Sequence, residues 1–535
     1  PVGDGFKVTF ADNTDHLEIP STTQAGWQVV GTSLGTFAYK VNANAVTELN
    51  LLGNLGNATY RQTGDLYGII LLPESATGAD IEAARKLLID RGAADASTII
   101  SAGAAWFRRY DIVEFKNAEF PDALTLGFAF EEATNLSKIS TVNAPLCPNF
   151  ASTWKDCSAL TSFPADAKLG TSAQNVNFSN AWRESGLTSF STPLPTGNNL
   201  IQAWYSCTSL ESFSAEITAG NLSYAWYNNT ALLEFKTTDI KTCSNFTSAW
   251  QNCSSLTQFP QDAKLGTEAS NVNFESAWRD SGLTSFSTPL PSAGNCRFSW
   301  FGSNLNTFSL ETLTATEFRS TWRDTNLSSF STTLPNSISF NGCWIDCSSL
   351  TDFAAGVFSD WNPSSIDDTV FHNAWDGCTS LTAQSVENIL VSIDASGKYA
   401  TTTGVSGGSA LTDAGIDIDY NVATGSLSAA TNTAIDSLSG KGWEVYINGV
   451  LVIPNILDLA PAAAYSLRSF DANADPNVVN VRRSSDNATS DFKASEVSDG
   501  TLRDWTLGNT LALDGQRMYF DGVDDYVDLN QSLIP

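Results

Sequence analysis

Hydrophobic residues recur in one local frame through the middle of the chain. A tryptophan is followed by Leu or Ile five or six residues later, and in most units by Phe at the eighth or ninth position. Residues 154–163 (WKDCSALTSF) and 250–259 (WQNCSSLTQF) are typical units. Their Leu-Thr-Ser-Phe type of run alternates apolar and polar residues, which predicts a short strand with one buried face.

The frame repeats often enough to define an array. Phe130 occupies the anchor position once, and successive anchors lie 22 to 31 residues apart, which gives twelve units. A second, longer repeat supports the array. Residues 164–195 recur almost unchanged at 260–291, an offset of 96 residues. The tryptophan anchors are Trp106, Trp154, Trp182, Trp204, Trp226, Trp250, Trp278, Trp300, Trp322, Trp344 and Trp375.

A unit of this length cannot bury its own aromatic residues, but stacked units form a continuous core. We therefore predict a mainly β repeat solenoid at residues 101–395, with about twelve coils and one parallel strand per coil. The Ser-Thr-Pro-Leu-Pro and Ala-Lys-Leu-Gly segments are expected to be turns, because Pro and Gly favour them. An end coil would expose its core and its strand edge, so α+β caps are expected at both ends.

The unit resembles the BspA-like leucine-rich repeats of bacterial surface proteins. The matching residues are 252–257 (NCSSLT) and 346–351 (DCSSLT), whereas Trp replaces the Met-Phe anchor and Phe replaces Leu. The resemblance covers about residues 100 to 395. It implies a leucine-rich-repeat-like fold and a surface or adhesion role without catalysis.

The segments on either side of the array do not follow its tryptophan repeat. Residues 1–100 are expected to be an N-terminal cap or attachment domain with strands at 6–10 and 26–30, a helix at 80–90, and two degenerate coils at 42–57. Residues 396–452 are expected to be a C-terminal cap, preceded by a helix at 384–392. This cap has a helix at 432–438 and a hairpin at Asn448-Gly449, a dipeptide that favours tight hairpin turns.

The last part of the chain follows a Pro- and Ala-rich linker at 453–464. Residues 465–469 and 479–488 resemble a segment of tailed-phage virion proteins, and 513–529 resembles the start of a concanavalin-A/laminin-G-like lectin domain. The segment 465–535 is therefore expected to be β-rich and to lead into a truncated lectin-like domain. The combination resembles a phage tail fibre or other virion appendage.

Composition narrows the function classes. The chain has 57 acidic and 28 basic residues, and its net charge of −29 disfavours nucleic acid as a partner. No run of about 18 apolar residues exists, so we expect no membrane insertion. Only His16 and His372 are present, which leaves little histidine for a metal site or a general base. We expect no cofactor, and calcium use stays open.

Nine cysteines invite a disulfide interpretation. Five of them lie three residues after an anchor, so we expect a row of small buried side chains. Cys147 with Cys157, and Cys243 with Cys253, are alternative pairs across a coil. The five cysteines that lie three residues after an anchor are Cys157, Cys207, Cys253, Cys347 and Cys378.

The candidate binding residues follow the anchors directly. The tryptophans themselves are expected in the core, since they hold a fixed repeat position. The next position varies, and if it faces outward it forms an aromatic and arginine stripe for stacking on sugars or peptides; ordinary surface variation is the alternative. The stripe consists of Arg183, Tyr205, Tyr227, Arg279, Phe301 and Arg323.

These patterns favour a non-catalytic structural and adhesion protein on the virion surface, with the solenoid as spacer and recognition module. Its expected partners are other virion proteins, a host-surface glycan or protein, and further copies of itself as a homo-oligomer. One alternative is an adhesin on the bacterial cell surface, and another is a polysaccharide depolymerase.

Overall fold

The computed structural model divides into two compact units, residues Pro1–Val452 and Ile453–Pro535. It describes residues 118–452 without interruption, and residues 65–116 except for 74, 92, 94–102 and 104. Outside these ranges it describes the backbone of short strands between 8 and 49 and between 465 and 493.

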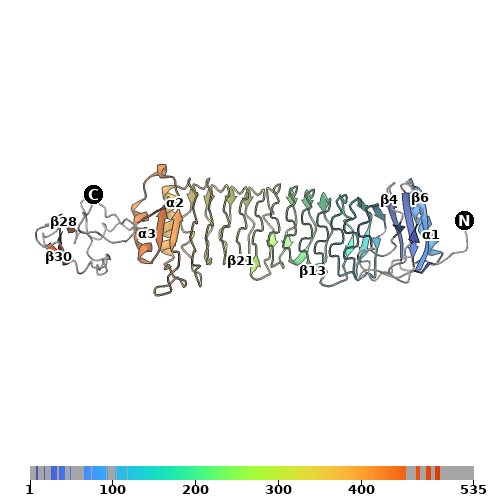
Figure 1. Ribbon diagram of the computed structural model, residues 1–535, viewed down its shortest axis with the longest axis horizontal. Coiled ribbons are helices and arrows are strands. Elements are labelled where there is room, and N and C mark those ends of the chain that lie inside the picture. The colour runs from blue at the N-terminus through green and yellow to red at the C-terminus, as the bar shows by residue number, and fades with distance from the viewer. Residues whose placement is uncertain are drawn as a thin grey trace. The chain divides into compact units, whose positions relative to one another are not determined.

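The middle of the first unit is a parallel β-solenoid of about ten turns (Figure 1). The predicted Leu-Thr-Ser-Phe strands pair in parallel from one turn to the next, and the phenylalanines are in register. This confirms the expected pairing. The strands are β12 (Ser189–Phe190), β14 (Ser212–Phe213), β16 (Glu234–Phe235), β20 (Ser285–Phe286), β22 (Thr307–Phe308), β23 (Ser329–Phe330) and β24 (Asp352–Phe353).

A second set of parallel strands lies elsewhere on the coils and includes segments that we expected to be turns. Lys168–Leu169 and Lys264–Leu265 of the Ala-Lys-Leu-Gly segments form β11 and β18, so the turn prediction was wrong for these residues. Each one pairs with a neighbouring coil, and the glycine that follows makes the bend. The other strands are β8 (Ala118–Glu119), β10 (Val142–Ala144), β13 (Thr196–Asn199), β15 (Thr218–Asn221), β17 (Asp239–Ile240), β19 (Val272–Asn273) and β21 (Ala293–Asn295).

Around each anchor the chain makes overlapping turns rather than a strand. The amide N–H of Trp182 donates to Ala203 O at 2.8 Å, and the N–H groups two residues to either side also donate to the next coil. Those two residues, Asn180 and Glu184, both have φ of 56°. The same positions have positive φ in nearly every coil, although few non-glycine residues adopt this region.

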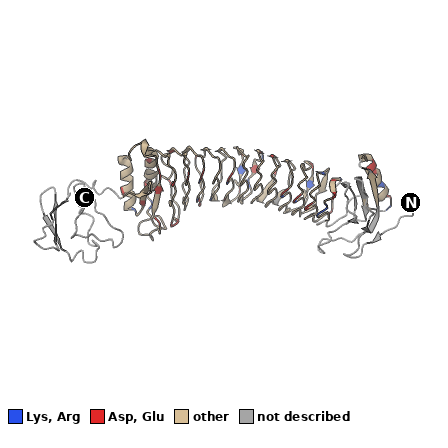
Figure 2. Ribbon diagram, turned by 45° about the horizontal axis from the view of Figure 1, so that its top comes forward, with Lys and Arg blue, Asp and Glu red and all other residues tan. Residues whose placement is uncertain are grey.

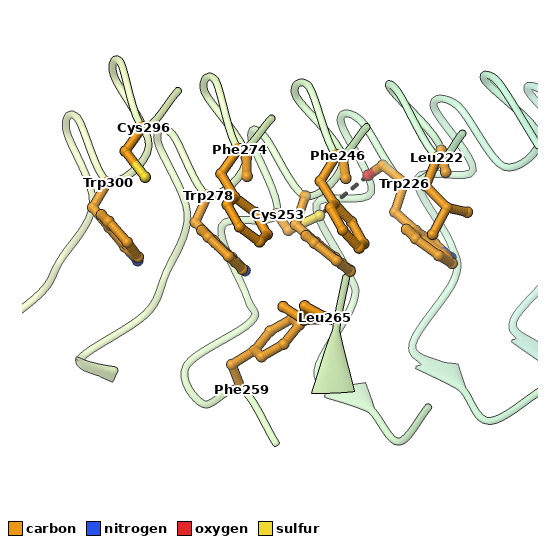
Figure 3. Close-up of a cluster of buried hydrophobic side chains, with 14 of the residues drawn as sticks. Leu222, Trp226, Phe246, Cys253, Phe259, Leu265, Phe274, Trp278, Cys296 and Trp300 are labelled. Atoms are coloured by element: carbon orange, nitrogen blue, oxygen red, sulfur yellow. Dashed lines mark hydrogen bonds between the residues drawn. The ribbon is translucent and has the colours of Figure 1, made fainter. Parts of the chain in front are cut away.

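The anchors form one column of stacked rings (Figure 3). From Trp154 to Trp375, consecutive indole centroids are 5.1–5.9 Å apart and the rings are within 12° of parallel. Phe130 bridges Trp106 and Trp154 with centroid distances of 4.9 and 6.5 Å. The predicted burial of the anchors is confirmed, because each tryptophan of the column is at most 2% exposed.

Twelve anchors therefore stack within about ten turns, fewer than the twelve coils expected. The first and last rings lie where the solenoid meets the flanking regions. Trp106 packs against Phe115 and Phe120, and the N–H of Trp375 donates to Asp417 O of the C-terminal region.

A column of phenylalanines runs beside the indoles. Phe190, Phe213 and Phe235 stack 5.6–5.7 Å apart and meet the anchors edge-on, as Phe213 does with Trp204 at 4.7 Å. The indole Nε1 groups of ten anchors, from Trp154 onward, have no hydrogen-bond acceptor among the described residues. The column is therefore held by ring packing rather than by indole hydrogen bonds.

The N-terminal region contains a six-stranded sheet in the order β1-β6-β3-β4-β7-β9. The helix α1 (Gly78–Ile89) confirms the predicted helix and begins with a capping box between Thr77 and Asp80. β7 pairs antiparallel with β4 and parallel with β9, so it links this sheet to the solenoid. The strands are β1 (Val8–Thr9), β3 (Gly26–Thr32), β4 (Gly35–Val41), β6 (Asp65–Pro73), β7 (Ile112–Lys116) and β9 (Lys138–Ile139).

The expected degenerate coils at 42–57 are only partly described. Within them β5 (Glu48–Leu49) pairs antiparallel with β2 (Leu17–Glu18), whereas a solenoid coil would pair in parallel. The strand of this segment thus does not belong to the array, because its partner comes from the N-terminal region.

The C-terminal part of the first unit continues the stack with helices. The helix α2 (Ala383–Ala395) follows the last anchor. The strands β25 (Gly415–Ile418) and β26 (Glu444–Ile447) pair in parallel. The chain between these two strands forms η2 (Val422–Thr424) and α3 (Ala429–Gly440). Both predicted helices are confirmed. So is the hairpin, since β27 (Val450–Leu451) pairs antiparallel with β26 across Asn448 and Gly449, which have φ of 50° and 72°.

The second unit contains a three-stranded antiparallel sheet of β28 (Tyr465–Ser469), β29 (Val478–Arg483) and β30 (Thr489–Lys493). The expected linker at 453–464 and the lectin-like segment at 513–529 lie outside the described residues.

Candidate ligand-binding surface

The six predicted binding residues occupy one row of the solenoid. Each follows a stacked anchor directly, so neighbouring coils place these side chains next to each other. Between the anchors Trp154 and Trp344 the row extends from Lys155 through Gln251 to Ile345, and the same position in the flanking coils is held by Phe107, Glu131 and Asp376. The structure thus brings all six together along the solenoid axis.

The row faces outward because its neighbours, the anchors, point into the core. All six side chains are half-buried. The arginines keep part of their length in solvent, with exposed fractions of 29% for Arg183, 36% for Arg279 and 40% for Arg323. The row is therefore accessible, although it is not a set of free side chains.

The first half of the row is an arginine–tyrosine cluster. The guanidinium carbon of Arg183 lies 4.6 Å from the ring centroid of Tyr205, a cation–π distance. Tyr205 stacks on Tyr227 with centroids 4.8 Å apart and an interplanar angle of 9°. Tyr224 belongs to the same coil as Tyr227, and the centroids of these two rings are 5.8 Å apart.

The second half is an arginine–phenylalanine cluster. Phe301 lies between Arg279 and Arg323, whose guanidinium carbons are 4.6 and 5.6 Å from its centroid. Phe298 is 6.2 Å from Phe301, and the Arg297 guanidinium lies 5.6 Å from Phe298. Two phenyl rings and three guanidinium groups thus share one surface.

Stacking within the row limits how it can meet a ligand. The sequence predicts a stripe for stacking on sugars or peptides, and in the structure Tyr205 and Phe301 each have a neighbour of the row on both faces. A ligand on this surface therefore meets ring edges and guanidinium N–H groups, not open aromatic faces.

Acidic side chains border the row at the next position of the coils that carry the arginines. Arg183 Nε donates to Glu184 at 3.0 Å, and Arg279 Nε donates to Asp280 at 3.2 Å. Arg323 lies 3.9 Å from Asp346. These pairs hold the guanidinium groups in place along the row.

Asp156 and Glu184 lie on neighbouring coils, and their pKa values are shifted in opposite directions. Burial raises the pKa of Asp156, and the neighbouring Glu184 carboxylate raises it further. The ammonium group of Lys155 acts in the opposite direction but does not outweigh these two effects. Burial also acts to raise the pKa of Glu184, but hydrogen bonds with Arg183 and Asp156 outweigh it and lower this pKa. The opposite directions follow from the hydrogen bond that joins the two carboxyl groups, which raises one pKa and lowers the other.

No family model, curated protein or solved structure matches this chain.

Two aromatic residues of the surface were missed from the sequence. Tyr224 and Phe298 lie two residues before an anchor, where φ is 57° and 55°, and most other coils place Ser, Asn, Gln or Gly there. Bulky aromatic residues in this region are unusual. Their signal was available, since both break the polar pattern of the position two before the tryptophan.

An asparagine ladder was also missed. Seven consecutive coils have Asn five residues before the anchor, and each Oδ1 accepts the N–H of the residue two positions on, as Asn221 does from Ser223 at 2.9 Å. The fixed Asn-to-Trp spacing could have revealed it. The residues are Asn149, Asn177, Asn199, Asn221, Asn245, Asn273 and Asn295.

The cysteines offer no reactive centre. All nine are free and buried, so neither alternative disulfide pair forms. The cysteines that lie three positions after an anchor donate to a carbonyl of the preceding coil, as Cys253 Sγ does to Trp226 O at 3.2 Å (Figure 3). Burial raises the pKa of Cys207 and of Cys253 to about 12, which disfavours the thiolate.

Among the described residues, no group of three or more His, Cys, Asp or Glu side chains is placed to hold a metal ion. None of the helices described is both long and apolar enough to cross a bilayer.

Proposed function

We propose that this chain is a non-catalytic structural and adhesion protein of a tailed-phage virion. In this proposal the solenoid is a rigid spacer that carries the arginine–aromatic row as its recognition surface. The virion context rests on the sequence resemblances of residues 465–469, 479–488 and 513–529.

The observation that carries the adhesion role is the continuous ring column. Every coil contributes one buried anchor, so bending the solenoid would separate rings that pack 5.1–5.9 Å apart. A stiff scaffold keeps the outer row in fixed register, which suits repeated weak contacts. Several copies on one particle, attached through other virion proteins, would multiply these contacts by avidity.

The repeat fits a leucine-rich-repeat-like unit with α+β caps in this proposal. The coil places its Leu and Phe in the core and its strand in a parallel ladder, as that repeat type requires. The helices α2 and α3 would then shield the last coil.

Locating the protein in purified particles tests the virion role. Mass spectrometry of the particles is expected to detect the chain, and antibody labelling in electron micrographs should place it on an external appendage. A chain found on bacterial cells and missing from particles would replace this proposal with the cell-surface adhesin.

A polysaccharide depolymerase is the alternative function. Asp156 and Glu184 hydrogen-bond to each other, so they lie too close together to flank a glycosidic bond and are not proposed as its acid and base. A depolymerase would release reducing ends when incubated with host polysaccharide. Binding without any release would leave the adhesion proposal in place.

A further inference from the structure

We infer that the outer row binds a linear polysaccharide that carries carboxylates and lies along the solenoid axis. This inference rests on the proposed adhesion function and specifies the class of its ligand. The surface consists of the two clusters, Arg183-Tyr205-Tyr224-Tyr227 and Arg279-Arg297-Phe298-Phe301-Arg323.

The hydrogen-bond donors of the row suit an anionic ligand. The chain has a net charge of −29, and charged residues of either sign lie at only a few places along the solenoid in this view (Figure 2). Between Lys155 and Ile345 the row contains a lysine and three arginines, and each of these cations pairs with an acid at a neighbouring position. The guanidinium N–H groups that these pairs leave over can donate to a carboxylate, which matches the planar fork of arginine.

The guanidinium groups are oriented for this contact. Arg183 and Arg279 use Nε for the acid of their own coil, and their planes lie over aromatic rings. A carboxylate would engage the terminal Nη atoms at the outer end of each fork. Since Phe301 has a guanidinium on each face, the second cluster offers two guanidinium groups on alternate coils, and the Nη2 atom of Arg323 lies 3.9 Å from Asp346.

The step between coils favours a sugar chain over a peptide. Parallel strands of successive coils are about 4.8 Å apart, a step close to the length of one pyranose residue in an extended chain. An extended peptide instead repeats its same-face side chains about every 6.6 Å and falls out of step between adjacent coils. A polysaccharide can therefore place one residue opposite each side chain of the row.

The solenoid backbone offers a peptide little in addition. The N–H groups of the anchor segments already donate to the next coil, as those of Asn180, Trp182 and Glu184 do. Strand addition to a free edge is the usual way in which an extended peptide gains affinity. Along these turns the ligand meets side chains only, which suits a polymer without backbone amides.

The duplication explains why there are two clusters. Arg183 and Tyr205 correspond to Arg279 and Phe301 at the offset of 96 residues, four coils further along. One polymer of sufficient length can span both, so the second contact becomes intramolecular. Affinity should therefore rise with chain length until both clusters are occupied.

Binding of the full chain to polygalacturonate, a polyuronic acid, tests the inference, with neutral dextran and polyglutamate as comparison probes. The variant Arg279→Gln with Arg323→Gln is expected to lose affinity for polygalacturonate about tenfold or more, because charged hydrogen bonds are lost. The matched control is Lys236→Gln with Lys241→Gln, which makes the same charge change at exposed lysines paired with Glu234 and Glu268. This control should bind like the wild type.

Salt, length and folding complete the test. Affinity should fall as salt is added, and short oligomers should bind more weakly than long ones. Circular dichroism of the stacked indoles must be unchanged in both double variants, so that lost binding reports the surface and not the fold. Equal losses in both variants, no binding of polygalacturonate, or equal affinity for polyglutamate would each overturn the inference.

The two proposals fail separately. If the chain adheres to host cells but does not bind polygalacturonate, the ligand class is wrong and the adhesion function stands. If it binds polygalacturonate through the arginines but is missing from virions and does not adhere to cells, the adhesion function is wrong and the site stands.

Discussion

At the residue scale, Gly186 and its repeat equivalent Gly282 mark the closest approach between coils. A Cβ atom at either position would lie 2.1 Å from a backbone oxygen of the preceding coil, that of Ser158 or Ser254. Both glycines follow their anchors by four residues. Only glycine fits there, because the obstacle is backbone and cannot rotate away.

Replacing Gly186 with alanine should destabilise the solenoid by about 1–3 kcal/mol, since the coils must separate to admit the methyl group. Thermal melting followed by circular dichroism measures the effect. Gly220→Ala is the control, because nothing lies within 4 Å of a Cβ at Gly220. Equal melting temperatures for the two variants would contradict the close approach.

The buried thiols give a second prediction at this scale. Burial raises the pKa of Cys207 and of Cys253 to about 12, whereas a free thiol ionises near 8.5. The native chain at pH 8 should therefore resist a thiol-specific disulfide reagent, and all nine cysteines should react after denaturation. Fast reaction of the native chain would show that the thiols are accessible.

The same shifts predict how stability depends on pH. Because the folded pKa is above the unfolded one, the contribution of the thiols is complete below about pH 8.5 and is lost as the pH rises towards 12. Replacing Cys207 and Cys253 with serine, which occupies the same repeat position at Ser185 and Ser281, should reduce this alkaline loss. Denaturant titrations across the range measure it.

At the scale of the element, the anchor column is the main source of cohesion. Each indole packs face to face with two neighbours and edge-on with phenylalanines, as Trp226 does with Trp204, Trp250 and Phe235. Its Nε1 group has no acceptor among the described residues, which costs free energy. Ring area, not the indole N–H, is therefore what the anchor position requires.

Trp226→Ala should cost about 3–5 kcal/mol, because it opens a cavity in the middle of the column. Trp226→Phe should cost clearly less, since it keeps a stacking ring and removes an unpaired donor. The native Phe130 at an anchor position supports this. Melting temperatures of both variants test the difference, and similar losses would mean that ring stacking contributes little.

At the scale of the whole molecule, the C-terminal part of the first unit closes the array. The N–H of Trp375 donates to Asp417 O at 3.1 Å, and Trp375 also forms a bridge with Ile418. The strands and helices after the last anchor thus continue the stack and then close it. Residues from Ile453 onward form a separate compact unit.

Truncation should distinguish these parts. A chain that ends at Val452 is expected to keep the melting temperature of the solenoid, because the second unit is separate. A chain that ends at Leu381 should melt lower and aggregate, because it lacks the partner of Trp375 and exposes a strand edge. Calorimetry and light scattering measure both effects, and equal behaviour of the two would refute the closing role.

Much of the array could be predicted because its signals are local and repeated. The period of the tryptophans predicted a solenoid, their buried column and the parallel phenylalanine strands, and Asn448-Gly449 predicted the hairpin. A large aromatic at a fixed repeat position has few alternatives to the core. The sequence by itself therefore determined the fold class and which residues are inside.

Contacts between coils decided the rest. Lys168–Leu169 became a strand because a neighbouring coil offered a partner, and Tyr205 and Phe301 lost their open faces to neighbours 22 residues away. Neither effect is visible within one unit. The tertiary structure alone decided how the surface presents its chemistry, because stacking brings side chains together that the sequence keeps a full turn apart.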